Sequence, residues 1–144
     1  MNYRGYAGQS QVYYENLLTQ LYNQVHSEIT QSYVEYGQHI PICFVGHSLG
    51  SKLALDLRFK VLQSDISQGI DRELKVYGYS IFGWLDNNLE NQLDKFQDYK
   101  LNHANNVVPN PDAQYEKLKT QTYTYINESD YVSQMWQHLY GYGT

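Results

Sequence analysis

Apolar side chains recur along the chain in two spacings, and these predict helices alternating with strands. From about Gln9 to Tyr36 they return every three or four positions, as on one face of a helix, and Gly37 is a typical C-terminal stop. A short apolar run at 40–45 predicts a buried strand. Helical spacing then resumes and predicts a second helix that ends at about Gln63.

The second half of the chain continues this alternation less regularly. Residues with high strand propensity predict strands at 74–79 and 121–126, and between them Asp86 can cap a short helix. The stretch 99–120 is ambiguous, and within it the prolines and asparagines at 105–111 favour a loop. Strands that alternate with helices predict a parallel α/β sheet, here within a single domain over residues 1–144.

Residues 46–50 read GHSLG and lie between the first predicted strand and the helix that follows it. The pattern G-x-S-x-G in this context forms a nucleophile elbow, in which the serine occupies a tight, strained turn with its hydroxyl exposed. The glycines two positions before and after Ser48 are expected to let the strand and helix backbones approach closely. The alternative is an ordinary strand-to-helix turn in which Ser48 caps the helix.

These residues and three further segments resemble the class 3 lipases, a family of α/β hydrolases. GHSLG is the form of the elbow common in that family, and VYGYSIFG at 76–83 is similar to its T-F-G-x-P-R-V-G segment. YRGY at 3–6 resembles the family's H-x-G-F, and YINESDYV at 125–132 resembles the strand and D-x-V turn that carry the triad acid. The resemblance implies a compact or truncated α/β-hydrolase fold, with a mainly parallel sheet flanked by helices.

The resemblance also implies a serine carboxylic-ester hydrolase, of the lipase or phospholipase type, that acts through an acyl-serine intermediate on Ser48. A serine hydroxyl becomes a good nucleophile only when an imidazole takes its proton and a carboxylate orients that imidazole. The backbone N–H of Leu49, first on the predicted helix, is one donor for the oxyanion. The expected substrate is a lipid or another acyl ester, which is compatible with peripheral contact with a membrane.

Asp130 is the preferred candidate for the triad acid. It follows a predicted strand at its C-terminal end, the edge where active sites of parallel sheets form. Asn106 is the rival position, because NNVVP around it resembles the family's N-D-x-V-P acid turn. An amide cannot stabilise imidazolium as a carboxylate does, so that alignment would imply a crippled enzyme or a substitute acid. Asp112 and Asp86 are further candidates.

His138 is the preferred candidate for the general base. HLYGYG from this residue is similar to the H-L-x-Y-F-G around the family's triad histidine, and the chain order Ser…Asp…His is kept. His103 is an alternative, and so is a base outside this chain. His47 lies inside the elbow and is expected to point away from the serine's face. His26 and His39 precede the nucleophile and are expected to be surface or packing residues.

The chain begins at the long helix, whereas class 3 lipases carry strands before it that supply a second oxyanion donor. Three predicted strands remain, with a fourth candidate at 99–102, so the sheet edge beside the nucleophile strand is expected to be open. The chain could be a piece of a longer product, a minimal hydrolase with another donor, or a subunit. In the last case a partner chain or a second copy would cover the open edge. We expect the first or the third.

Composition and charge exclude several classes of ligand and structural feature. The net charge of −5 with no basic stripe argues against nucleic acid, and no His/Asp/Glu cluster has metal-ligand spacing, so no metal or cofactor is expected. Cys43 is the single cysteine, which excludes an internal disulfide, and its place in a predicted strand suggests a buried thiol. No membrane-spanning stretch or signal peptide is visible, which predicts a cytoplasmic protein or one exported by a non-classical route.

A second function stays open at the level of sequence. A catalytically inactive lipase-like domain could serve as a binding or structural subunit, and the sixteen tyrosines would suit a partner surface. Acyltransferases and thioesterases use the same triad as carboxylic-ester hydrolases. An acyltransferase differs from them only in the acceptor, and a thioesterase only in the ester that it cleaves.

Overall fold

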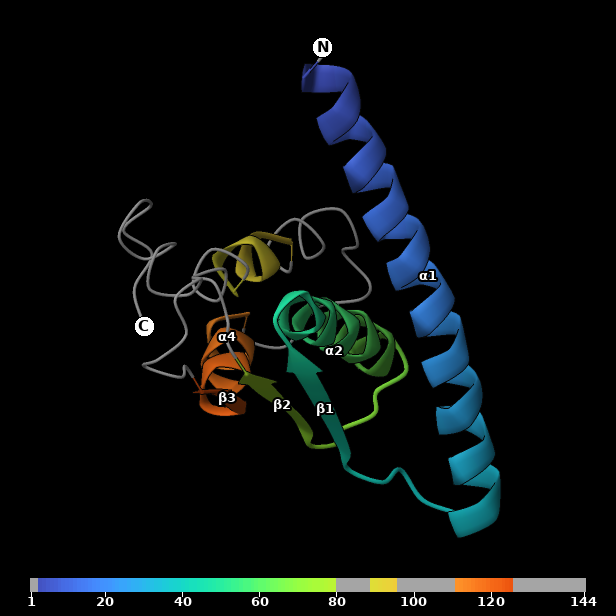
Figure 1. The fold of residues 1–144 in the computed structure, drawn as a ribbon. Helices are drawn as coiled ribbons and strands as arrows, with labels where there is room; N and C mark the ends of the chain where they lie inside the picture. The colour runs from blue at the N-terminus through green and yellow to red at the C-terminus, as the bar shows by residue number, and fades with distance from the viewer. Residues whose placement is uncertain (1–2, 80–88, 96–110, 126–144) are drawn as a thin grey trace. The chain divides into compact units, whose positions relative to one another are not determined.

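The structure is a computed structural model that describes residues 3–79, 89–95 and 111–125. The chain divides into two compact units, Met1–Ile40 and Pro41–Thr144. The described elements are, in chain order, α1 (Tyr3–Tyr36), β1 (Ile42–His47), α2 (Leu49–Ser67), β2 (Leu74–Tyr79), a short helix at 89–95, α4 (Pro111–Thr120) and β3 (Thr122–Tyr125) (Figure 1).

The first unit contains α1, a single helix of 34 residues. It begins earlier than the apolar spacing predicted, at Tyr3, and ends at Tyr36 as predicted. Gly37 adopts a positive φ of 70°, and its N–H donates to the carbonyl of Tyr33 at 2.8 Å, which closes the last turn. A residue with a Cβ would be strained in this conformation, so glycine at this position fixes the helix end.

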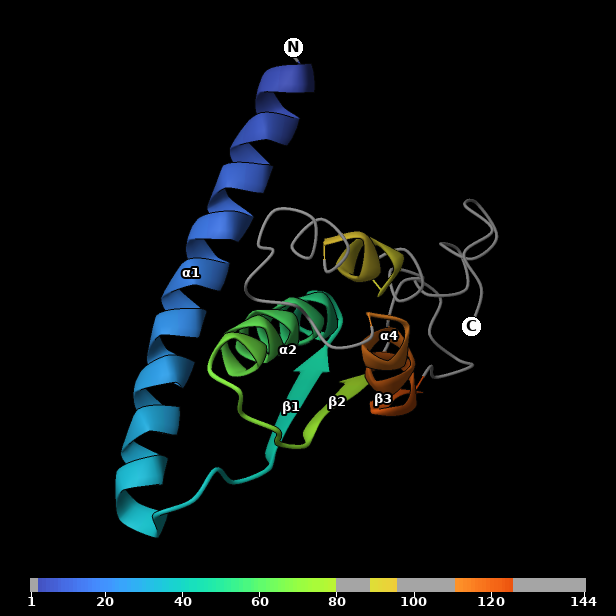
Figure 2. The same cartoon turned by 180° about the vertical axis from the view of Figure 1, so that it is seen from behind.

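The second unit is built on a parallel sheet with the strand order β1-β2-β3. Ile42 lies opposite Leu74 and His47 opposite Tyr79, so β1 and β2 pair in register over their whole length. The helix α2 runs along one face of β1 and β2, and both views show this arrangement (Figure 1 and Figure 2). The predicted α/β fold with a parallel sheet flanked by helices is confirmed.

The core lies between this face of the sheet and α2. Phe44 of β1 and Val76 of β2 are buried against the helix, whose own buried face includes Leu55. Among the described residues of this unit, the further buried apolar side chains are Ala54, Leu57, Phe59, Val61, Leu62, Leu74, Leu89 and Leu118. Because α2 is anchored by apolar side chains along its length, its first turn is held in a fixed place at the end of β1.

The elements differ from the predictions at α4 and at the end of α2, which continues past the predicted Gln63 to Ser67. β2 has the predicted bounds, whereas β1 and β3 are shifted or shortened by one or two residues. α4 is a helix that begins at the end of the predicted loop, within the stretch that the sequence left ambiguous. Pro111 occupies its first position, where its missing N–H costs nothing, and two lysines in its last turn suit the negative end of the helix. The fourth candidate strand at 99–102 and the capping residue Asp86 lie outside the described residues.

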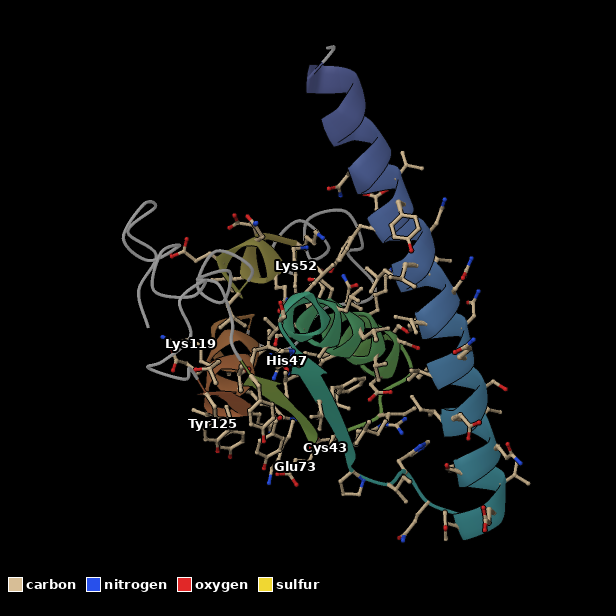
Figure 3. The ribbon with its side chains drawn as sticks, viewed as in Figure 1. Cys43, His47, Lys52, Glu73, Lys119 and Tyr125 are labelled. Carbon is tan, nitrogen blue, oxygen red and sulfur yellow. The ribbon has the colours of Figure 1, made fainter. Side chains whose placement is uncertain are left out.

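The sheet face opposite α2 is exposed within the described part of the chain. Side chains alternate along β1, so Cys43, Val45 and His47 all lie on this second face, and Figure 3 labels the first and the last of them. Tyr77 stacks on Tyr123 with ring centroids 4.9 Å apart. The predicted burial of Cys43 is therefore wrong: the thiol is exposed, because no described residue covers this face.

β1 is an outer strand of the described sheet, and no described strand pairs with its edge that faces away from β2. This agrees with the expectation from the sequence. The partner chain or second copy that would cover this edge stays a prediction.

A buried ion pair links the C-terminal part of α2 to the segment between α2 and β2. The guanidinium of Arg72 donates from Nε and Nη2 to the two carboxylate oxygens of Asp65, at 2.8 and 3.0 Å. Their side chains are 4% and 5% exposed. Arg58 is also buried, but it pairs with no described carboxylate. Its Nη1 donates a hydrogen bond to the carbonyl of Gln121 at 3.2 Å. Burial lowers the pKa of Arg58 to about 10, so the group remains charged at neutral pH.

Replacing Arg72 with methionine should lower the free energy of unfolding by about 3–5 kcal/mol, because the carboxylate of Asp65 would stay buried without its counter-charge. Arg58→Met is the matched control, since it removes a buried guanidinium that no described carboxylate pairs with. We expect that change to cost at most about 1 kcal/mol. Urea unfolding followed by circular dichroism compares the two, and equal losses would contradict this explanation.

Candidate active site

The backbone of Ser48 is strained. Its φ of 54° and ψ of −123° make it the one non-glycine residue with a positive φ in the described part of the chain. Such a conformation costs about 1–3 kcal/mol and persists only where the surroundings enforce it. Ser48 stands directly before α2, yet its side chain makes no capping hydrogen bond to the helix. The alternative of an ordinary helix-capping serine is therefore wrong.

The two glycines that flank Ser48 have different roles. A Cβ on Gly46 would overlap the carbonyl of Gly50 and lie 2.7 Å from the backbone nitrogen of Ser51. The first turn of α2 thus passes directly over Gly46. A Cβ on Gly50, in contrast, would meet no atom within 4 Å. The expected close approach is found, but only the first glycine is required for it.

Backbone hydrogen bonds tie the serine to both neighbouring elements. The N–H of Ser48 donates to the carbonyl of Tyr79 at the end of β2, at 2.9 Å. The N–H of Ser51 donates to the carbonyl of Ser48, also at 2.9 Å, which starts the first turn of α2. Ser48 is held in this way between the C-terminal ends of β1 and β2 and the start of a helix.

The backbone N–H of Leu49 lies beside this serine. Leu49 is the first residue of α2, and the N–H groups of a first helical turn have no partner within their own helix. The positive end of the helix dipole adds to their attraction for negative charge. Leu49 is 51% exposed and Ser48 is half-buried, so neither residue is enclosed in the core.

The model of one protein family, described as lipase (class 3), matches residues 3–138. The chain belongs to the class 3 lipase family. No curated protein and no solved structure matches it. The family match includes the strained serine and both parallel strands that hold it, and it indicates a lipase-like function, that of a hydrolase of the lipase type.

Three histidines lie within the described residues, and none is hydrogen-bonded to Ser48 there. His47 is exposed and lies at the end of β1 (Figure 3). The alternation of side chains along β1 places it on the sheet face away from α2. The ring of His39 stacks on that of Tyr33 at 4.6 Å, within the first unit. His26 stacks on a tyrosine of its own helix, at 6.0 Å. These are the surface and packing contacts expected of them.

The predicted acid and base, Asp130 and His138, lie outside the described residues, as do His103, Asn106 and Asp86. What the structure describes is the strand that leads to them. β3 ends at Tyr125, which lies opposite Tyr79, and Tyr79 lies opposite His47. The C-terminal end of β3 therefore lies on the same side of the sheet as the C-terminal end of β1, where the elbow begins. The two ends are two strand spacings, or about 10 Å, apart. The roles of Asp130 and His138 stay predictions.

The described residues contain no group of three metal-ligating side chains, and no described helix is long and apolar enough to cross a membrane.

A pocket of about 360 Å³ is lined by Ile66, Ile70, Arg72 and Lys117, among others. It lies at the C-terminal end of α2, whereas Ser48 precedes the N-terminal end, about 28 Å away along the helix. This pocket does not belong to the candidate active site.

One residue of the site was not recognised in the sequence. Ser51 is fully buried, and its hydroxyl lies 3.1 Å from the carbonyl of Gly46 and 3.0 Å from that of Tyr79. The signal available was a small polar residue on the inner face of the first helical turn, three positions after Ser48. Its contacts depend on β2, which is far away in the sequence.

Proposed function

We propose that the protein hydrolyses carboxylic esters of lipids, or other acyl esters, through an acyl-serine intermediate on Ser48. The observation that supports this most directly is the strained, half-buried serine at the C-terminal edge of a parallel sheet, directly before a helix. A backbone strained in this way is costly to maintain, and such strain is concentrated at functional sites. Membership of the class 3 lipase family supports the same reaction.

In the proposed reaction, Ser48 Oγ attacks the ester carbonyl carbon while the imidazole of His138 takes the hydroxyl proton. The carbonyl oxygen becomes an oxyanion, which accepts a hydrogen bond from the N–H of Leu49. When the tetrahedral intermediate collapses, the alcohol leaves with the proton from His138. Water then attacks the acyl-serine by the same route and releases the acid. Asp130 keeps the imidazole in the required tautomer and stabilises its charged form.

The experiment that tests the proposal is labelling with a fluorophosphonate probe, which reacts only with an activated serine. We expect one adduct per chain at neutral pH, located on Ser48 by peptide mass spectrometry. A wild-type protein that is folded but never labelled would overturn the proposal.

That outcome would favour the second candidate function, an inactive lipase-like domain that binds a partner. The exposed tyrosines on the second face of the sheet support this candidate. Tyr79 and Tyr125 stack at 5.2 Å and present their rings on the exposed surface, as aromatic residues often do at protein interfaces.

The roles of Asp130 and His138 can be tested by substitution. We expect His138→Ala to lower the rate of labelling by at least about 1,000-fold, because Ser48 would lose its base, and Asp130→Asn to lower kcat by about 10,000-fold. His103→Ala is the matched control and should leave both values unchanged. If His103→Ala abolishes labelling and His138→Ala does not, the assignment of the base is wrong.

A further inference from the structure

The hydroxyl of Ser51 connects three elements at the elbow. Ser51 lies in the first turn of α2. Its Oγ is within hydrogen-bond distance of a carbonyl near the C-terminal end of each strand, that of Gly46 in β1 at 3.1 Å and that of Tyr79 in β2 at 3.0 Å. The residue is 0% exposed, so water does not compete for these bonds. A serine hydroxyl has one proton to donate, and here it is shared between a carbonyl of β1 and a carbonyl of β2.

Both of these carbonyls belong to groups that also position the nucleophile. The carbonyl of Tyr79 accepts the N–H of Ser48 as well as the hydroxyl of Ser51. Gly46 is the residue over which the first turn of α2 passes. The N–H of Ser51 donates to the carbonyl of Ser48. Ser51 therefore contacts the backbone of Gly46 and of Ser48 itself, and also the end of the neighbouring strand β2.

From this arrangement we propose that Ser51 is a positioning residue, whose hydroxyl fixes the strained backbone of Ser48 and the start of α2. The proposal rests on the proposed function, because it assigns Ser51 a role in the same reaction. A positive φ at Ser48 is kept only while the surrounding contacts enforce it. Without the hydroxyl, the first turn of α2 can move away from the ends of β1 and β2. Both Ser48 Oγ and the N–H of Leu49 would then move relative to the substrate, and such displacements are costly in rate.

The test is Ser51→Ala, which removes the hydroxyl and keeps the backbone N–H. We expect the amide hydrogen of Ser48 to exchange with solvent about tenfold faster, because opening of the elbow becomes easier, while amides of β2 away from the elbow stay unchanged. We also expect the rate of fluorophosphonate labelling to fall about tenfold. In ester hydrolysis, kcat should fall while KM stays the same, since binding groups are not removed.

Val61→Ala is the control for a general loss of stability. Val61 is a buried apolar residue of the same helix, but it lies ten positions further along. This variant should lower the free energy of unfolding without changing exchange at Ser48 or the labelling rate of the folded protein. If it changes both as strongly as Ser51→Ala does, the proposal is wrong.

The measurements separate the two hypotheses. Unchanged exchange at Ser48 in Ser51→Ala would overturn the positioning role whether or not the wild type reacts with the probe. Faster exchange with an unchanged labelling rate would overturn it as well. A wild-type protein that is never labelled would overturn the proposed function, and the exchange data would still decide whether Ser51 holds the backbone of Ser48.

Discussion

Replacing Ser48 with alanine should abolish fluorophosphonate labelling and lower kcat for ester hydrolysis by about 10⁴- to 10⁶-fold. The reason is that in the proposed reaction the hydroxyl forms the covalent bond to the acyl group, so no remaining group could take over its step. The residual rate would come from substrate binding and from the N–H of Leu49 alone. Steady-state kinetics with a soluble p-nitrophenyl ester, together with mass spectrometry of the labelled protein, measures both effects.

Stability should respond differently from activity. Alanine has a Cβ like serine, so Ser48→Ala keeps the backbone strain, and its free energy of unfolding should stay within about 1 kcal/mol of the wild type. Ser48→Gly removes the Cβ that makes a φ of 54° unfavourable. We therefore expect the glycine variant to be more stable than the alanine variant by about 1 kcal/mol, although both are inactive.

Two results would contradict this explanation. Ester hydrolysis that persists in Ser48→Ala would assign the reaction to another nucleophile. A glycine variant less stable than the alanine variant would show that the conformation of Ser48 carries no strain, and the main structural support for a nucleophile would be lost.

The parts of the fold that the sequence predicted well are those determined by local chemistry. Gly37 ends α1 because its positive φ is a property of that one residue, and β2 follows from its own strand-forming residues. The burial of Cys43 was predicted wrongly because a strand pattern does not say which sheet face is covered. α4 was missed because the helix-starting Pro111 follows asparagines and another proline, which are typical of loops.

The candidate site divides in the same way. The elbow could be predicted because Gly46, Ser48 and the helix that follows are close together in the sequence. The role of Ser51 could not, since its hydroxyl contacts Tyr79, a residue 28 positions away. Sequence order alone also does not show which aspartate and histidine meet the serine, because this depends on the path of the chain after β3.

Replacing Gly46 with alanine should be the most damaging single change to the scaffold of the site. The added Cβ would overlap the carbonyl of Gly50, a backbone group that cannot rotate away. Either α2 moves away from β1 or the end of β1 distorts, and both are costly in a tightly packed core. We expect the free energy of unfolding to fall by at least about 3 kcal/mol.

Activity should fall in Gly46→Ala beyond the effect on stability. Moving the first turn of α2 displaces Ser48 and the N–H of Leu49 relative to a bound substrate. A misplacement of about 1 Å in a catalytic group can cost about 100-fold in rate, and we expect a loss of at least this size in the labelling rate of the folded fraction. Labelling is measured at a temperature well below the midpoint of thermal unfolding, so that unfolded protein does not contribute.

Gly50→Ala is the matched control for this experiment. It introduces the same methyl group on the other glycine of the pattern, where no atom lies within 4 Å. Alanine is also the better helix former, so the variant should be as stable as the wild type or more stable by up to about 1 kcal/mol, with an unchanged labelling rate. If Gly50→Ala is as damaging as Gly46→Ala, then the crowding at the elbow is not confined to the strand side. If instead both variants behave like the wild type, the close passage of α2 over Gly46 is not what fixes the position of Ser48.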